Sequence, residues 1–206
     1  REMVFPCIFQ EKWQKYLVVG DKCGILKNSL LLRFIYRSRK RKEAVRVNLK
    51  QLLEGISYEV QQGTADVEIS DFQYDSRKVE KDGLFVCITG FQTDGHKYIP
   101  MALEKGAVAL LCEHRVENVP EGVTVLVTEN NRIALALLSD HFYGHPSAEM
   151  NVIGVTGTNG KTSTTYLMKS ILDRIGKKVG IIGTIENRIG DEVLKAERTT
   201  PESKEL

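Results

Sequence analysis

Residues 151–175 read NVIGVTGTNGKTSTTYLMKSILDRI, and this stretch decides how the rest of the chain is interpreted. A short β-branched run, a glycine-rich turn and a segment with apolar residues three to four positions apart predict a strand, a loop and a helix in that order. A phosphate-binding loop has this order, because successive backbone N–H groups and the N-terminus of the helix then face the phosphate oxygens. The stretch therefore predicts the start of a P-loop domain built on a parallel sheet.

The candidate ATP site lies in the turn and the first residues of the helix. Glycines at 157 and 160 let the backbone curl around a phosphate group, and Lys161 is placed to reach the β- and γ-phosphates. Lys161 is the candidate catalytic residue, and the hydroxyl of Thr162 is the predicted ligand of Mg²⁺. The common motif has glycine where Val155 stands, so the match departs from the general pattern there. The predicted ATP-binding set is Gly157, Thr158, Asn159, Gly160, Lys161, Thr162 and Ser163.

Composition and charge restrict the class of protein. The 206 residues, 42% of them hydrophobic, suffice for one large or two modest cores. Four widely spaced cysteines without a Cys-x-x-Cys pair argue against a zinc site and against a disulfide framework, and favour a reducing cytoplasm. No stretch approaches the roughly 18 uninterrupted apolar residues of a membrane span. The basic run that follows Leu30–Leu32 stands on the wrong side of the apolar residues for a secretory signal.

Residues 1–46 differ from the rest of the chain. They carry 12 Lys/Arg against 4 Asp/Glu, whereas residues 47–206 carry 17 against 23. Because these residues show no sustained hydrophobic periodicity and no turn signals, we expect them to form a basic, unstructured segment. A basic tail that binds nucleic acid or an anionic membrane is a second interpretation. A third is that Lys42-Glu43-Ala44 encodes a ribosome-binding sequence before a GTG start at Val47, so that residues 1–46 are a leader read as protein.

From Val47 onward the pattern predicts two α/β units. Breaker residues at 144–149 mark the boundary, so the expected domains are 47–149 and 150–206. The second unit has its next strand at 179–183, which predicts two parallel strands around the helix, and it looks incomplete because a lone strand-helix-strand cannot bury its own faces. In the first unit we expect a short amphipathic helix at 49–56, strands at 67–72, 84–88, 107–112 and 123–127, and helices at 97–105 and 131–143.

Five motifs occur in a fixed order along the chain. They are Asp75-Ser76-Arg77, Asp82 to Val86, Gly90 to His96, the ATP loop, and Thr199-Thr200-Pro201. In this order they resemble the Mur ligase family, and within it the MurE branch. The MurF branch is the close alternative, although it usually has serine at the position of Thr158 and lacks the Thr-Thr-Pro segment. Cyanophycin and folylpolyglutamate synthetases are more distant relatives.

The resemblance implies a function for each unit. It implies that the first unit binds a UDP-sugar and that the second binds ATP and Mg²⁺. The enzyme would phosphorylate the D-glutamyl carboxylate of UDP-N-acetylmuramoyl-dipeptide to an acyl phosphate, and the amine of an incoming amino acid would then displace the phosphate. Diaminopimelate and L-lysine are both used in the family, and meso-diaminopimelate is expected here because it is the commoner choice. It further implies a cytoplasmic monomer without a nucleic-acid partner. The implied substrate-binding residues are Ser76, Phe91, Gln92, Thr93, Thr199 and Thr200, with Phe91 departing from the histidine of many relatives.

The resemblance also implies that this chain binds its ligands but does not turn over alone. The family's carbamylated lysine, its magnesium-binding glutamate and its amino-acid-selecting domain are not in the sequence.

Several of these residues also have a purely structural interpretation. Ser76 is expected to cap a turn and Arg77 to pair with a surface acid if the ordered motifs are disregarded. His96 and His145 are expected to be solvated rather than metal ligands. A different class of function is a non-catalytic P-loop regulator with a nucleic-acid-binding front, in which Glu186 would serve magnesium.

Overall fold

The computed structural model describes residues 16–20, 46–90, 93–195 and 201–205. The chain forms two compact units. One comprises Leu30–Phe142, and the other comprises Arg1–Ser29 with Tyr143–Leu206. The division falls immediately before the breaker segment at 144–149, where His145 has a left-handed backbone (φ 57°).

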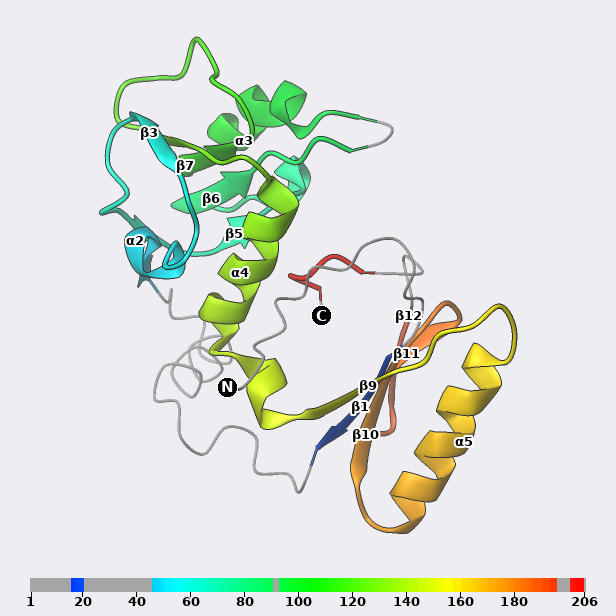
Figure 1. Ribbon diagram of the computed structural model, residues 1–206. Coiled ribbons are helices and arrows are strands. Elements are labelled where there is room, and N and C mark those ends of the chain that lie inside the picture. The colour runs from blue at the N-terminus through cyan, green and yellow to red at the C-terminus, as the bar shows by residue number, and fades with distance from the viewer. Residues whose placement is uncertain (1–15, 21–45, 91–92, 196–200, 206) are drawn as a thin grey trace. The chain divides into compact units, whose positions relative to one another are not determined.

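The Leu30–Phe142 unit is built on a mixed, mostly parallel sheet (Figure 1). Its strand order is β3-β8-β7-β6-β5, and the four strands from β8 to β5 are parallel to one another while β3 joins the edge antiparallel. The sheet strands are β3 (Glu59–Gln62), β5 (Phe72–Gln73), β6 (Gly83–Val86), β7 (Ala107–Cys112) and β8 (Thr124–Val127). The remaining elements are β2 (Val47–Asn48), α2 (Leu49–Leu52), β4 (Glu68–Ile69), η1 (Ser76–Lys78), η2 (Gly95–Tyr98), α3 (Ile99–Glu104) and α4 (Asn131–Tyr143).

The central strands are apolar along their whole length because both faces of the sheet are covered. One face of β6 and β7 packs against α3 in a cluster that includes Phe85, Leu110 and Ile99. Elsewhere in the core, Phe72 of β5 meets Phe142 of α4 edge to face, with ring centroids 5.2 Å apart. A continuous run of apolar residues, rather than an alternating one, is what a strand buried on both faces requires.

The predicted elements of this unit form with some changes. The strand at 107–112 and the helix at 131–143 appear with the predicted bounds, as β7 and α4. The segment 67–72 is instead divided between β4 and β5. The Ser70 N–H between them donates to Asp82 O, so this residue belongs to neither strand. The sequence pattern also misses β3, an edge strand whose apolar residue Val60 is 45% exposed.

The second unit has a five-stranded sheet in the order β12-β11-β10-β1-β9. The two strands that flank the helix are parallel to each other, as predicted, but they do not pair directly. β9 and β10 run in the same direction, but β1 lies between them and is antiparallel to both. Its elements are β1 (Tyr16–Gly20), η3 (Pro146–Glu149), β9 (Asn151–Gly154), α5 (Lys161–Arg174), β10 (Lys178–Ile182), β11 (Glu186–Ile189) and β12 (Glu192–Lys195).

Strand β1 also corrects the expectation that residues 1–46 are unstructured throughout. The run Tyr-Leu-Val-Val, bounded by Gly20, has the β-branched apolar character of a strand and forms one. Residues 1–15 and 21–45 lie outside the described residues, so the leader hypothesis stays a prediction.

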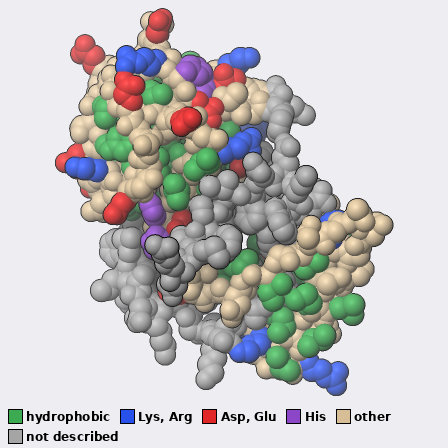
Figure 2. Space-filling model, in the orientation of Figure 1, with side chains coloured by type: hydrophobic (Ala, Val, Ile, Leu, Met, Phe, Trp, Pro, Cys, Tyr) green, Lys and Arg blue, Asp and Glu red, His purple; other side chains and the backbone are tan. Residues whose placement is uncertain are grey.

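The second unit has a small core. Among the residues of this unit whose side chains the structure describes, Val179 and Ile181 are the buried apolar ones, and Tyr166, Met168 and Leu172 of α5 pack against them. On the other side of α5, Leu167, Ile171 and Ile175 are 64–66% exposed, and Figure 2 shows apolar side chains gathered over this part of the molecule. Across the described residues, no helix has the length and apolarity that a membrane crossing requires.

Candidate nucleotide and substrate sites

The predicted phosphate-binding loop connects the end of β9 to the first residue of α5. Thr158 and Asn159 are exposed, and the glycines on either side of them have positive φ angles, 145° at Gly157 and 78° at Gly160. A side chain at either position would strain the backbone, which explains the two glycines. Within the described residues, no backbone N–H from Gly157 to Gly160 donates to a protein acceptor. These N–H groups and the N-terminus of α5 therefore form a cradle that fits an anion.

Lys161 begins α5 and turns back over the loop. Its ammonium donates to the backbone carbonyl oxygens of Gly157 and, at 3.3 Å, Thr158. The charge is thus held at the mouth of the cradle, where phosphate oxygens would replace the two carbonyls as acceptors. Ser163, the last residue of the predicted ATP set, is exposed in the first turn of the helix.

Thr162 lines a shallow hollow beside the first turns of α5. The hollow is also lined by Tyr166 and by Glu186, the residue that the regulator interpretation would use for magnesium. The Glu186 carboxylate accepts hydrogen bonds from the Tyr166 hydroxyl (2.5 Å) and from Arg188 Nε (2.7 Å). These two bonds lower the pKa of Glu186, with Tyr166 the larger cause, and the same contact raises the pKa of Tyr166.

In the other unit, Ser76 lies at the start of η1 and is 6% exposed. The residue that caps this turn is Asp75 rather than Ser76: its Oδ1 accepts from the Arg77 N–H at 3.0 Å. Asp75 also pairs with the Arg77 guanidinium at 2.8 Å, and that side-chain hydrogen bond is the main reason why the pKa of Asp75 is lowered. The Ser76 hydroxyl instead donates to the sulfur of Met101 at 3.3 Å.

The two predicted substrate loops of this unit meet the same helix. Helix α3 contacts η1, which begins with Ser76, and η2, which follows Thr93 in sequence. Thr93 is exposed, and its hydroxyl lies 3.3 Å from the hydroxyl of Tyr98. The structure therefore brings Ser76 and Thr93 to the neighbourhood of one helix, whereas Phe91, Gln92, Thr199 and Thr200 lie outside the described residues.

Two features of the site region have no signal in the sequence. Asn131, fully buried at the start of α4, ties together the ends of β6 and β7 by donating to the carbonyls of Cys87 and Leu111. The prediction that His96 is solvated is wrong, since its side chain is only 6% exposed and packs near Cys87 and Cys112. These residues come from three separate elements, so their spacing in sequence gives no indication that they meet.

The chain thus combines a mixed α/β unit with a strand, a loop of the phosphate-binding type and a helix. Residues 68–143 match the profile of the Mur ligase family catalytic domain, and residues 155–206 match that of the Mur ligase middle domain. The chain belongs to the Mur ligase family.

Individual members of the family can be compared with this chain in sequence. The UDP-N-acetylmuramoyl-L-alanyl-D-glutamate--2,6-diaminopimelate ligase 1 of Clostridium acetobutylicum is 48% identical over 160 residues, which is 78% of this chain and 33% of that protein. The corresponding ligase of Alkaliphilus oremlandii is 49% identical over 158 residues, 77% of this chain and 32% of the relative. The chain thus spans about a third of the length of the relatives it matches.

A solved structure of UDP-N-acetylmuramoylalanyl-D-glutamyl-2,6-diaminopimelate--D-alanyl-D-alanyl ligase from Acinetobacter baumannii aligns with 64% of this chain and 29% of its own. Sequence identity is 21% and the TM-score is 0.42. This partial overlap adds no argument of its own.

Proposed function

We propose that this chain supplies the UDP-sugar-binding unit and the ATP loop of a ligase of the kind its relatives are named for. The proposed reaction adds 2,6-diaminopimelate to UDP-N-acetylmuramoyl-L-alanyl-D-glutamate, at the expense of ATP, in peptidoglycan synthesis. The observation that carries the proposal is the loop itself, in which free N–H groups, a helix N-terminus and the Lys161 ammonium converge on one exposed cradle.

The chemistry explains why such a loop is needed. A carboxylate is a poor acyl donor, so the γ-phosphoryl group of ATP is first transferred to it, and the amine of the incoming amino acid then displaces phosphate. The loop N–H groups hold the phosphates, and Lys161 neutralises charge on the transferring group. Thr162 would hold a magnesium ion, whose charge further stabilises the phosphates. Catalysis by these residues is positioning and electrostatic stabilisation rather than covalent chemistry.

The other unit would bind the UDP-sugar through Ser76, Phe91, Gln92 and Thr93, while Thr199 and Thr200 would hold the substrate near the reacting carboxylate. The environment of Ser76 suits this role. Its hydroxyl donates to the Met101 sulfur, a weak acceptor, and Met101 is 40% exposed. A substrate oxygen that displaced the methionine would be a better acceptor than the sulfur, and burial would strengthen the new bond.

Titration calorimetry on the full chain tests these assignments. ATP with Mg²⁺ and UDP-N-acetylmuramoyl-dipeptide are expected to bind at separate sites. Lys161→Ala should weaken ATP at least about tenfold, as expected for the loss of a charge-assisted hydrogen bond, without affecting the UDP-sugar. Ser76→Ala should do the reverse. Lys178→Ala, which removes an exposed lysine of the same unit as the loop, is the control and should change neither affinity.

Other results would contradict these assignments. A folded chain that binds no ATP, or a Lys161→Ala variant that binds it as well as the Lys178→Ala variant does, would move the nucleotide elsewhere. Binding of D-alanyl-D-alanine-accepting UDP-tripeptide in preference to UDP-dipeptide would favour the MurF branch.

A further inference from the structure

Two cysteines lie side by side at the carboxyl ends of adjacent parallel strands. Cys112 is the last residue of β7, and Cys87 follows β6 directly. The register pairs Val86 with Leu111, so the next position along brings the two cysteines opposite each other. Both are free thiols that are fully buried, and their sulfurs are 3.8 Å apart.

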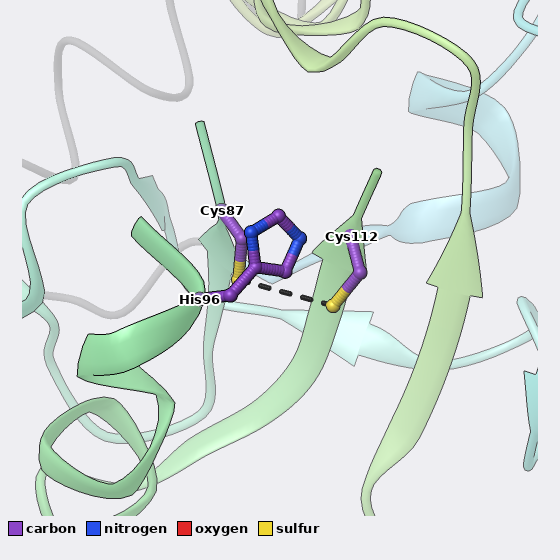
Figure 3. Close-up of side chains that lie close together, drawn as sticks. All are labelled: Cys87, His96 and Cys112. Atoms are coloured by element: carbon purple, nitrogen blue, oxygen red, sulfur yellow. Dashed lines mark hydrogen bonds between the residues drawn. The ribbon is translucent and has the colours of Figure 1, made fainter. Parts of the chain in front are cut away.

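A histidine completes the cluster, as Figure 3 shows. His96 of η2 places its ring beside the two sulfurs, and the candidate ligand atoms of the three side chains all lie within 4.8 Å of one another. Sulfur and imidazole nitrogen are the donors that zinc and similar soft cations prefer. A tetrahedral zinc ion bonded to two thiolates at about 2.3 Å sets their sulfurs about 3.8 Å apart, which is the separation found here.

The histidine is already oriented as metal-binding histidines usually are. Asp94 Oδ1 lies 2.5 Å from His96 Nδ1 and also accepts the His96 backbone N–H at 2.9 Å. With Nδ1–H donating to this carboxylate, the lone pair is left on Nε2. A carboxylate behind the ligating imidazole fixes the tautomer and raises the basicity of the ligand.

Charge and burial favour a divalent ion in this position. Two thiolates and a neutral imidazole balance the charge of a divalent cation, and a neutral assembly is the kind that an apolar core accommodates at least cost. Apolar side chains, among them Phe85, Ile99 and Leu110, pack in the same cluster as the two cysteines, while Asp94 and His114 contact the imidazole.

We propose that Cys87, Cys112 and His96 bind a thiophilic metal ion, zinc being the ion that fits best. Such a site belongs to the Leu30–Phe142 unit, whereas the ATP loop and Thr162, the proposed magnesium ligand, belong to the other unit. The ion would clamp β6, β7 and η2 together at the carboxyl ends of the two strands. Three protein ligands leave the fourth position of the zinc for a small exogenous ligand such as water.

One hydrogen bond must be exchanged when the ion binds. The Glu113 N–H donates to His96 Nε2 at 3.0 Å and occupies the lone pair that the metal needs. This N–H adjoins Cys112 in sequence, so the adjacent thiolate can accept it once zinc takes the imidazole nitrogen. The ring of the exposed residue His114 stacks on His96, with centroids 3.9 Å apart.

Cobalt serves as the first probe on the full chain, kept reduced with a phosphine and freed of metal. We expect one equivalent of Co²⁺ to give thiolate-to-cobalt charge-transfer absorption and the intense visible bands of tetrahedral cobalt, both abolished by one equivalent of Zn²⁺. X-ray absorption of the zinc-loaded wild-type chain should give two sulfur ligands near 2.3 Å and a nitrogen near 2.0 Å, a readout that needs no variant. An absence of metal-dependent absorption in the reduced, folded chain would overturn the proposal.

Variants locate the ion. Cys112→Ser and Cys87→Ser should each lower affinity for cobalt at least a hundredfold, with circular dichroism confirming that the variants fold. Two controls carry the same chemistry elsewhere: Cys7→Ser with Cys23→Ser removes the other thiols, and His114→Ala removes the neighbouring imidazole. Both should bind cobalt as the wild type does. Loss of binding in the first control would place the ion at the N-terminal thiols, and loss in the second would place it on Asp94, His96 and His114, either of which contradicts the proposed ligand set.

Discussion

Replacing Asn131 with alanine should destabilise the Leu30–Phe142 unit by about 2–4 kcal/mol. The side chain donates to Cys87 O at 2.6 Å and to Leu111 O at 2.9 Å, and it accepts from the Thr128 hydroxyl at 2.5 Å. Each buried group left without a partner costs about 1–3 kcal/mol. The sum is reduced because Leu111 O still accepts from the Cys87 N–H at 2.8 Å.

The neighbouring residue provides a matched control. Asn130 accepts from the N–H groups of Arg132 and Ile133 at 3.0 and 3.1 Å, but it is exposed. As a helix cap, Asn130→Ala should cost only about 1 kcal/mol. Hydrogen exchange of the β6, β7 and β8 amides against urea measures the loss in this unit alone. An Asn131→Ala variant no less stable than Asn130→Ala would refute the argument that these buried bonds hold the strand ends together.

Three further predictions concern other parts of the chain. Gly157→Ala should abolish ATP binding by straining the loop, whereas Gly176→Ala, also at positive φ (77°) but after α5, should leave affinity unchanged in calorimetry. Because Arg77 lowers the pKa of Asp75, the stability from this pair is present above the unfolded value of about 4 and is lost as pH falls through the lower folded pKa, and Asp75→Asn should flatten that acid limb in a pH series of unfolding curves. Amides of β9 to β12 should exchange with solvent faster than those of β6 to β8, because Val179 and Ile181 are the only buried apolar side chains among the described residues of the second unit, and equal protection would contradict this.

The sequence predicts well wherever local chemistry decides the structure. The loop between β9 and α5 needs positive φ at 157 and 160, and glycine, which adopts it without strain, stands at both positions. The apolar runs at β7 and the three-to-four spacing of α4 likewise specify their own elements. Ser76 and Thr93 were predicted only by resemblance, and the structure places both near α3 without showing what they bind.

The sequence does not predict features that depend on contacts between residues far apart in the chain. No local pattern indicates that Tyr16–Gly20 enters a sheet between β9 and β10, because strand order depends on which edges remain unpaired. Cys87, His96 and Cys112 meet only because β6 and β7 are neighbours in register and η2 folds back across their ends. The cap of the Ser76 turn was misassigned by one residue, since an aspartate and a serine side by side are both good caps.

The proposed role of residues 47–206 is to perform the UDP-sugar and ATP functions of a diaminopimelate-adding ligase. It is tested most directly by a chimera in which they replace the 160 matching residues of the Clostridium acetobutylicum relative. With UDP-N-acetylmuramoyl-L-alanyl-D-glutamate and 2,6-diaminopimelate, the chimera should form the amide product only when ATP is present, and Lys161→Ala in it should lower turnover at least about a hundredfold. A folded chimera that binds both nucleotides yet forms no product, or one in which Lys161→Ala keeps near-normal turnover, would contradict the account.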